Sequence, residues 1–224
     1  MKASLRAGVA LLFLVGCVRT PKPIPPTPEC MVLVPTGEAL VGTNDLDTDE
    51  ERRPQRRVSL PGFFIDRTEV TNAQLARFRP GRMVAPGQEN LPATGVTYEE
   101  AEAYARWAGK RLPTEDEWEK AARGTDGRAY PWGSAWDKAK VAARAPKPTQ
   151  KLACGKPSRV RPVGSVPSGI SPYGCLDMAG NAWEWVQGHP NGNPAQRLLK
   201  GGAVGYGERG CRSYERGIEG AKAT

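Results

Sequence analysis

Histidine is almost absent from this 224-residue chain, which contains only His189. Zinc sites built on paired histidines, and other multi-histidine metal centres, are therefore excluded. The apolar run Ala7–Val15 is well short of the roughly 20 residues that a membrane-spanning helix needs. The sequence also lacks a Lys/Arg-rich helix and any nucleic-acid-binding motif, so the excess of 32 Lys and Arg over 24 Asp and Glu indicates a basic surface without nucleic-acid partners.

Glycine and proline are abundant, with 26 and 21 residues, while 39% of the residues are hydrophobic. This content is too high for a helical bundle, and it has neither the period nor the amount expected of a collagen-like or wholly disordered chain. We therefore expect a loop-rich α+β domain.

The N-terminus has the pattern of a secretory signal. Lys2 and Arg6 precede the apolar run Ala7–Val15, and Gly16 and Cys17 follow it. The ending resembles a bacterial lipobox, which predicts a lipoprotein signal peptide at residues 1–16 and lipidation of Cys17. Several acyl chains anchor a protein stably to a membrane. Because Val18 and not an aspartate follows the cysteine, we expect a lipid-anchored protein of the cell envelope, with the outer membrane favoured.

Residues 17–29 are proline-rich and predict a stiff tether, since such segments prefer the extended polyproline II conformation. The folded domain is expected over residues 30–224. Four cysteines besides Cys17 remain, and an even number in an oxidising compartment indicates up to two disulfides with three alternative pairings. These cysteines are Cys30, Cys154, Cys175 and Cys211.

Local patterns predict strands at Met31–Val41 and Val58–Ile65, and then three helices. Each helix opens with a Thr-x-x-Glu/Gln capping box, and the second and third are expected at Tyr98–Ala108 and Glu115–Arg123. The three boxes pair Thr71 with Gln74, Thr97 with Glu100, and Thr114 with Glu117. Residues 124–171 show no long periodic element, so this segment is expected to be pinned by a metal or a disulfide, with Cys154 as one candidate.

An acidic segment that begins at Asp45 has aspartates at alternating positions, as calcium loops do. An EF-hand loop starting there would need glycine at its sixth position and glutamate at its twelfth, where Glu50 and Arg56 stand. We interpret it as a solvated loop neutralised by neighbouring arginines, namely Arg52, Arg53, Arg56 and Arg57.

Several motifs, taken in order, resemble those of the sulfatase-modifying-factor family, whose founding member is formylglycine-generating enzyme. The resemblance covers roughly residues 31–217. Its most specific parts are Arg111–Arg123 and the Gly-Asn-x-Trp-Glu-Trp run within Tyr173–Trp185. The other matching segments are Glu69–Asn72, Tyr130–Gly133, Pro162–Gly164 and Lys200–Gly202.

The resemblance implies an irregular α+β fold of the formylglycine-generating-enzyme type, related to C-type lectin-like domains. The founding enzymes oxidise a sulfatase cysteine to formylglycine, with copper(I) held between two thiolates. On the family's pattern this sequence has Ala203 at a serine position, Tyr206 at the first cysteine position and only Cys211 at the second. A phenol is a hard and poor ligand for Cu(I). Copper is therefore not expected, and Cys211 is predicted to be half of a disulfide or a buried thiol, with a catalytic cysteine as the alternative.

The resemblance also implies a calcium site, and here, unlike at the copper pair, the sequence keeps the matching residues. The matching ligands are the side chains of Asp177 and Glu184 and the carbonyl oxygens of Gly180 and Ala182. Hard Ca²⁺ prefers such oxygen ligands, and two carboxylates offset its charge. The alternative is that both carboxylates make only hydrogen bonds or ion pairs. A second family calcium site is not expected, because Val141–Arg144 lacks the required asparagine.

Two functions from different classes remain. The first is a non-catalytic structural or binding module with a peptide or protein ligand, and Tyr206, Trp132 and Trp136 are candidates for a ligand groove or for the core. The second is a copper-dependent oxidase that acts on a sulfatase cysteine. Other family reactions, such as hydroxylation or iron-dependent sulfur chemistry, typically use histidine ligands or an extra domain, and the one histidine argues against them.

Overall fold

The computed structural model describes residues 30–48, 52–142, 150–151, 157–158 and 160–220. The predicted signal peptide, Cys17 and the predicted tether lie outside these residues. None of the helices in the described part of the chain has the length and apolar character needed to cross a bilayer.

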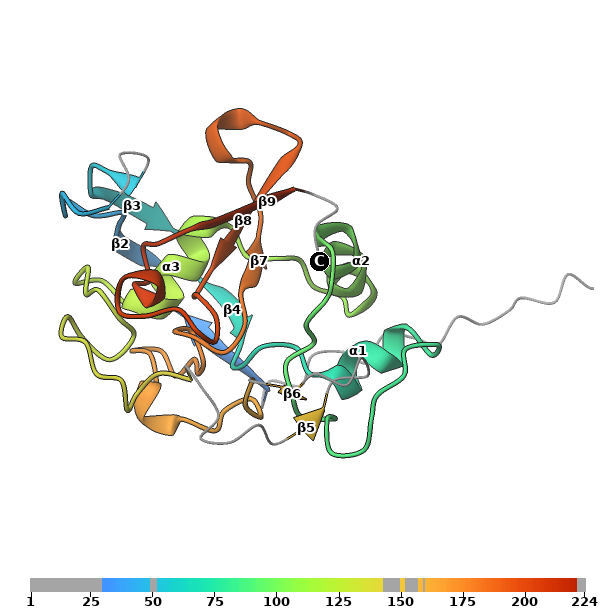
Figure 1. Cartoon of the computed structure of the whole chain (residues 1–224). Helices are drawn as coiled ribbons and strands as arrows, with labels where there is room; N and C mark the ends of the chain where they lie inside the picture. The colour runs from blue at the N-terminus through green and yellow to red at the C-terminus, as the bar shows by residue number, and fades with distance from the viewer. Residues whose placement is uncertain (1–29, 49–51, 143–149, 152–156, 159, 221–224) are drawn as a thin grey trace, which may run out of the picture.

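The strands form small antiparallel sheets (Figure 1). Strand β1 (Met31–Val34) pairs with β4 (Phe63–Asp66), and β2 (Gly37–Val41) pairs with β3 (Arg56–Leu60). A third sheet has the order β7-β8-β9, and a short pair joins β5 to β6. These last strands are β7 (Glu184–Val186), β8 (Gln196–Lys200), β9 (Gly217–Gly220), β5 (Gln150–Lys151) and β6 (Pro157–Ser158).

Each of the two strands predicted near the N-terminus is divided in two. The break between β1 and β2 comes at Pro35 and Thr36, and the break between β3 and β4 comes at Pro61 and Gly62. Proline lacks the N–H that a strand ladder needs, so both breaks follow from the sequence. The N–H of Gly62 donates to Oγ1 of Thr36 at 2.8 Å, which ties the two bends together.

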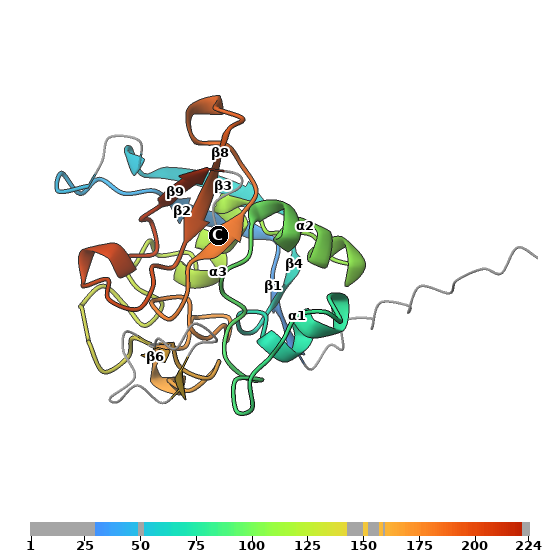
Figure 2. The same ribbon diagram turned by 45° about the vertical axis from the view of Figure 1, so that its right-hand side comes forward.

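The helices begin where their capping boxes predict. They are α1 (Asn72–Phe78), α2 (Tyr98–Trp107) and α3 (Glu115–Arg123). In all three boxes the threonine side chain accepts from the backbone N–H three residues later, and the Glu or Gln side chain there accepts from the backbone N–H of the threonine. Helix α2 ends one residue before its predicted end. Helices α1 and α2 lie together on one side of the molecule, while α3 lies among the sheets (Figure 2).

Helix α3 is the centre of the core. Trp118, Ala121 and Ala122 are fully buried, and they pack in one cluster with Val34 of β1 and Val186 of β7. Lys120 is also buried, and its Nζ donates to the carbonyl oxygens of Pro35 and Gly37 at 2.7 and 2.8 Å. The helix therefore holds the bend between β1 and β2 through a charged side chain as well as through apolar contacts.

Two aspartates of the acidic loop contact residues from the C-terminal part of the chain. Asp47 pairs with Arg212 at 2.9 Å, and Asp45 accepts a short hydrogen bond from Tyr214. Arg52 instead forms an ion pair with Glu215 at 2.9 Å. The contacts of Asp45 and Asp47 thus come from the C-terminal part of the chain, while Asp49, Glu50 and Glu51 lie outside the described residues.

The sequence predicted up to two disulfides, and the described part of the chain contains none. Cys175 and Cys211 are buried and carry free thiols, and no disulfide joins any cysteines of the described segments. Cys175 packs in the cluster around Trp118, whereas Cys211 packs in another cluster with Val141 and Ala179. Cys154, predicted to pin residues 124–171, lies outside the described residues.

Candidate functional site

The predicted calcium residues lie where β7 begins. Glu184 is the first residue of β7, and its Oε2 accepts a hydrogen bond of 2.9 Å from Nε1 of Trp118. Trp185, whose side chain points to the opposite face of the strand, donates through Nε1 to the carbonyl oxygen of Val96 at 2.9 Å. Because successive side chains of β7 point to opposite faces, the Glu184 carboxylate points toward the core and Trp118.

Asp177 and a third acid complete a cluster of carboxylates. Oδ2 of Asp177 accepts a hydrogen bond from the N–H of Gly164, whereas its Oδ1 is buried without a hydrogen-bond donor. Both carboxylate oxygens of Glu69 are also buried without a donor. Glu69 was missed as a site residue because it precedes Asp177 by more than a hundred positions, although it opens one of the quoted family motifs.

Burial raises the pKa of all three carboxyls, and repulsion from neighbouring carboxylates adds to the effect at Glu69 and Glu184. Burial raises the pKa of Glu184 to about 7, and the charge of Asp177 adds to the effect. Burial also raises the pKa of Glu69 well above its usual value, followed by the charges of Asp177 and Glu184. The pKa of Asp177 is raised by burial as well. Such a group must either take up protons or hold a cation, because buried unpaired carboxylates are costly.

The donor set fits calcium only when backbone oxygens contribute. No three Asp, Glu, Cys or His side chains of the described segments converge closely enough to hold a metal by themselves. The loop between Asp177 and Glu184 is held firmly, since the N–H of Gly180 donates to the carbonyl oxygen of Gly201 at 2.8 Å, and Oδ1 of Asn181 accepts from the N–H of Arg161 at 2.8 Å. Unpartnered carboxylate oxygens beside a fixed loop suit a hard cation that also takes carbonyl ligands.

Cys211 does not lie in an environment that suits copper. Its side chain is fully buried, and burial raises the pKa of its thiol to about 11. Its Sγ lies 3.7 Å from the carbonyl oxygen of Tyr206, and the Tyr206 ring packs edge-on against Trp183 with ring centres 5.2 Å apart. A single protonated thiol, with no second cysteine of the described residues in its cluster, does not match the pair of soft ligands that Cu(I) requires.

The aromatic residues proposed for a groove belong to two groups. Trp132 stacks on Tyr130 with ring centres 5.2 Å apart, and Trp136 packs against both at 6.3 and 5.2 Å. Trp132 and Trp136 also cover the cluster that contains Cys211. Tyr206 is separate and 49% exposed. The two tryptophans therefore serve mainly as core, while Tyr206 remains available at the surface.

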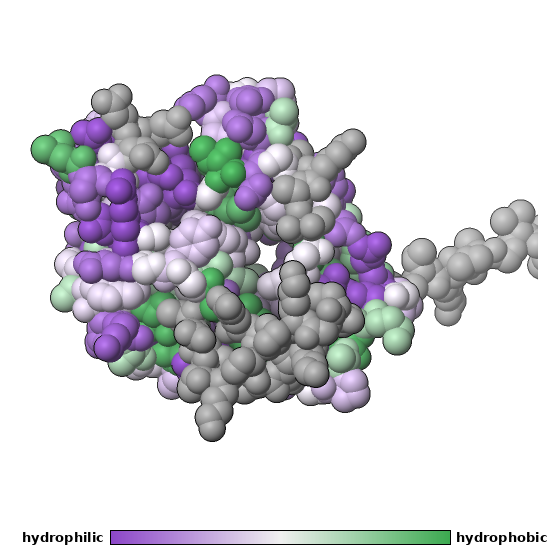
Figure 3. Space-filling view, viewed as in Figure 1, coloured by the Kyte–Doolittle hydropathy of each residue, from purple (hydrophilic) through white to green (hydrophobic). Residues whose placement is uncertain are grey.

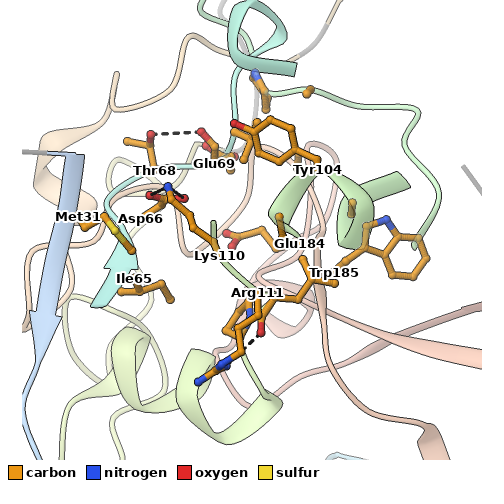
Figure 4. Close-up of a pocket in the computed structure, with 18 of the residues that line it drawn as sticks. Met31, Ile65, Asp66, Thr68, Glu69, Tyr104, Lys110, Arg111, Glu184 and Trp185 are labelled. Carbon is orange, nitrogen blue, oxygen red and sulfur yellow. Dashed lines mark hydrogen bonds and ion pairs between the residues drawn. The ribbon is translucent and has the colours of Figure 1, made fainter. Parts of the chain in front are cut away.

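A cavity of about 500 Å³ opens beside the carboxylates. It lies between β4, β7 and α2, where the space-filling view is hollowed near the centre of the face (Figure 3). Glu69 and Glu184 line it, as do Tyr104 and Trp185 (Figure 4). Lys110 also lines it, but its Nζ is occupied by both oxygens of Asp66 at 2.6 and 2.8 Å. The unpartnered polar groups of the cavity are thus acidic.

Comparison with known families identifies the chain. A family model described as the sulfatase-modifying factor enzyme 1-like domain matches residues 18–224. The chain belongs to this family. Among solved structures, PvdO from Pseudomonas aeruginosa has a TM-score of 0.68 and 25% identity, with 86% of this chain and 89% of that chain covered. A Treponema denticola variable protein has a TM-score of 0.65 at 20% identity and shares the fold. The predicted fold class is therefore confirmed.

Relatives in this family carry different names. The chain is 37% identical to serine/threonine-protein kinase Pkn1 of Chlamydia trachomatis over 70% of its own length and 27% of that protein. It is 34% identical to hercynine oxygenase of Mycolicibacterium smegmatis over 69% of its own length and 44% of that protein. It is 30% identical to inactive C-alpha-formylglycine-generating enzyme 2 of Mus musculus, with 88% and 81% covered. The chain spans less than half the length of the first two relatives, so family membership alone assigns no reaction to it.

Proposed function

We propose that this member of the sulfatase-modifying-factor family is a non-catalytic binding or structural module, lipid-anchored in the cell envelope, that holds calcium beside its cavity. The observation that carries the non-catalytic role is the state of Cys211. Its thiol is buried and protonated at neutral pH, and on the family's pattern Tyr206 stands at the first cysteine position, where the other copper thiolate would be.

The calcium part of the proposal rests on charge. Asp177, Glu184 and Glu69 place three carboxyls in the interior, and three of their oxygens lack a hydrogen-bond donor. A divalent cation offsets two of these charges, and the carbonyl oxygens of Gly180 and Ala182 supply neutral ligands. When bound, calcium would stabilise the folded chain without taking part in chemistry.

A thermal-unfolding experiment tests the calcium site. With free calcium at 100 times its dissociation constant, we expect a gain of about 2.7 kcal/mol over protein in EGTA. For a domain of this size that corresponds to a rise in Tm of roughly 5–10 °C. Magnesium should give a smaller rise, because it demands stricter geometry and gives up its water reluctantly.

Two matched aspartates provide the control. Asp177→Ala should abolish the response to calcium, whereas Asp126→Ala should keep it, since Asp126 is a half-exposed surface residue paired with Arg128. An unchanged Tm in the unsubstituted protein, or an equal response in the two variants, would rule out calcium at this position.

The non-catalytic role is tested by supplying copper(I) and a cysteine-containing sulfatase peptide. We expect mass spectrometry to show no aldehyde product. In the variant Tyr206→Cys, which restores a second soft ligand, the affinity for Cu(I) should rise at least about tenfold, or 1.4 kcal/mol, in competition with a chromophoric chelator. Copper-dependent aldehyde formation by the unsubstituted protein would instead support the alternative, a copper oxidase that uses Cys211.

The envelope location rests on the sequence pattern at Cys17. Two or more acyl chains on this cysteine would hold the protein at a membrane. We expect the full chain to incorporate labelled palmitate and to sediment with outer membranes, and Cys17→Ser to move to the soluble fraction. A full chain that incorporates no label would exclude the anchor.

A further inference from the structure

The cavity beside Glu69 has the size of a small-molecule site. Its volume of about 500 Å³ falls within the range of roughly 300–1,000 Å³ that is usual for such sites. Aliphatic side chains from distant parts of the chain line it, among them Ile65 of β4, Leu75 of α1 and Leu176. This lining suits a ligand with an apolar body.

Aromatic rings line the cavity as well. Tyr104 of α2 and Trp185 of β7 lie in its wall (Figure 4). Phe63 of β4 does so too, as does Trp183, which comes just before β7. Rings pack well against other rings in edge-on or offset arrangements, and a rigid ring system loses less conformational freedom on binding than a flexible chain. The walls therefore favour an aromatic ligand over a linear aliphatic one.

Three hydrogen-bond donors in the lining already have partners within the protein. Nε1 of Trp185 donates to a backbone carbonyl oxygen at 2.9 Å. Nζ of Lys110 donates to both oxygens of Asp66 at 2.6 and 2.8 Å. The guanidinium of Arg111 donates to both oxygens of Glu117 at 2.6 Å. A ligand would therefore gain little by bringing an acceptor or a negative charge to these groups.

Glu69 differs from these groups, because its carboxyl lacks a donor. Both of its oxygens are buried with no hydrogen-bond partner in the described structure, and such buried acceptors are costly. An ionised carboxylate has two oxygens that accept, and a protonated carboxyl still has one, so a donor satisfies Glu69 in either state. Glu69 is also not among the residues assigned to calcium, which leaves a ligand to supply this donor.

We infer that the cavity binds a neutral aromatic small molecule whose hydroxyl or N–H group donates to the carboxyl of Glu69. A neutral donor suits both protonation states of Glu69, whereas a cation would suit only the ionised one. The inference names the ligand class for the binding role proposed above and rests on that role.

The test uses isothermal titration calorimetry at neutral pH with three probes. The first, 2-naphthol, carries a hydroxyl on two fused rings, whereas 2-methoxynaphthalene keeps the oxygen without its proton. The third, 1-octanol, carries the hydroxyl on an aliphatic chain. We expect saturable binding of 2-naphthol, about tenfold tighter than that of 2-methoxynaphthalene, because the ether cannot donate. Binding of 1-octanol should also be weaker than that of 2-naphthol.

Two substitutions of Glu69 test the hydrogen bond itself. Glu69→Met removes both acceptor oxygens and should abolish the preference for 2-naphthol over the ether. Glu69→Gln keeps one carbonyl oxygen and should retain most of that preference. Because each variant is titrated with both probes, a general change in the shape of the cavity cancels in the ratio of the two affinities.

Two alanines of α2 supply a control for the cavity. Ala101→Phe fills part of the cavity and should weaken binding of 2-naphthol at least about tenfold. Ala103→Phe places the same ring on a part of α2 that does not line the cavity, and it should leave binding unchanged. Circular dichroism checks that both variants fold, and Ala101→Leu provides a smaller change if the phenylalanine variant does not.

Several results would overturn the inference. They are the absence of saturable binding of 2-naphthol, equal or tighter binding of the ether or of 1-octanol, a preference that survives in Glu69→Met, and equal losses in the two alanine variants. All titrations are made in calcium and again in EGTA, and Tm is measured alongside. A Tm that rises with calcium while 2-naphthol does not bind would refute this inference and leave the calcium proposal standing. Binding without a calcium response would refute the calcium proposal alone.

Discussion

Replacing Glu119 by alanine is expected to lower the free energy of unfolding by about 3–5 kcal/mol. Glu119 is buried in α3, where it pairs with Arg123 at 2.5 Å and Lys200 at 3.1 Å and accepts from the N–H of Gly42 at 2.6 Å. Its removal leaves two buried cations without that carboxylate, and this is costly in a low-dielectric interior. Urea unfolding followed by tryptophan fluorescence measures the change.

The control is an acidic residue on an exposed helix face. Glu102 pairs with Arg106 one turn away on α2, and both side chains are substantially exposed. Glu102→Ala should therefore change the free energy of unfolding by less than about 1 kcal/mol. If Glu119→Ala proves no worse than Glu102→Ala, the buried network does not stabilise the fold as described. Glu119→Gln provides a milder test if the alanine variant does not fold.

Gly180→Ala is expected to cost about 3 kcal/mol of stability and to weaken calcium binding. The φ angle of Gly180 is +92°, which side chains with a Cβ rarely adopt. A Cβ there would also lie 2.8 Å from Cγ1 of Val141 and 3.0 Å from backbone atoms of Ala142. The loop would have to move, and in the proposed calcium site this movement would displace the carbonyl ligand assigned to Gly180.

Gly95 separates the backbone effect from the steric effect. Its φ angle is also positive, at +68°, but no atom lies within 4 Å of a Cβ added to it. Gly95→Ala should therefore cost only the strain of the backbone, about 1 kcal/mol, and leave the response to calcium unchanged. Urea unfolding and calcium titration of the two variants provide the comparison. Equal costs would mean that the crowding around Gly180 is unimportant.

The parts of the fold that depend on neighbouring residues were predictable from the sequence. Each capping box involves residues three positions apart, so Thr71, Thr97 and Thr114 located the starts of the helices. The pairing of charges was not predictable in this way. Arg52 pairs with Glu215, which lies far from it in the sequence, because folding brings distant segments together.

Of the candidate site, only the residues that lie close together in the sequence were predictable. Asp177 and Glu184 lie within one short motif, so a family resemblance was enough to propose them as ligands. Glu69 could be added only when the fold placed it beside Asp177, since no spacing rule connects the two positions. The state of Cys211 also needed the structure, because its burial depends on Val141 and Ala179, which lie far from it in the sequence.

The connections made by α3 have a consequence for how the chain folds. The contacts of Lys120 with Gly37, and of Glu119 with Gly42 and Lys200, join residues roughly eighty positions apart. Two-stranded sheets such as β1-β4 and β2-β3 are marginally stable alone. The N-terminal half is therefore expected to gain a stable structure only when β8 is also present to pack against α3, whether the chain folds at the ribosome or after export.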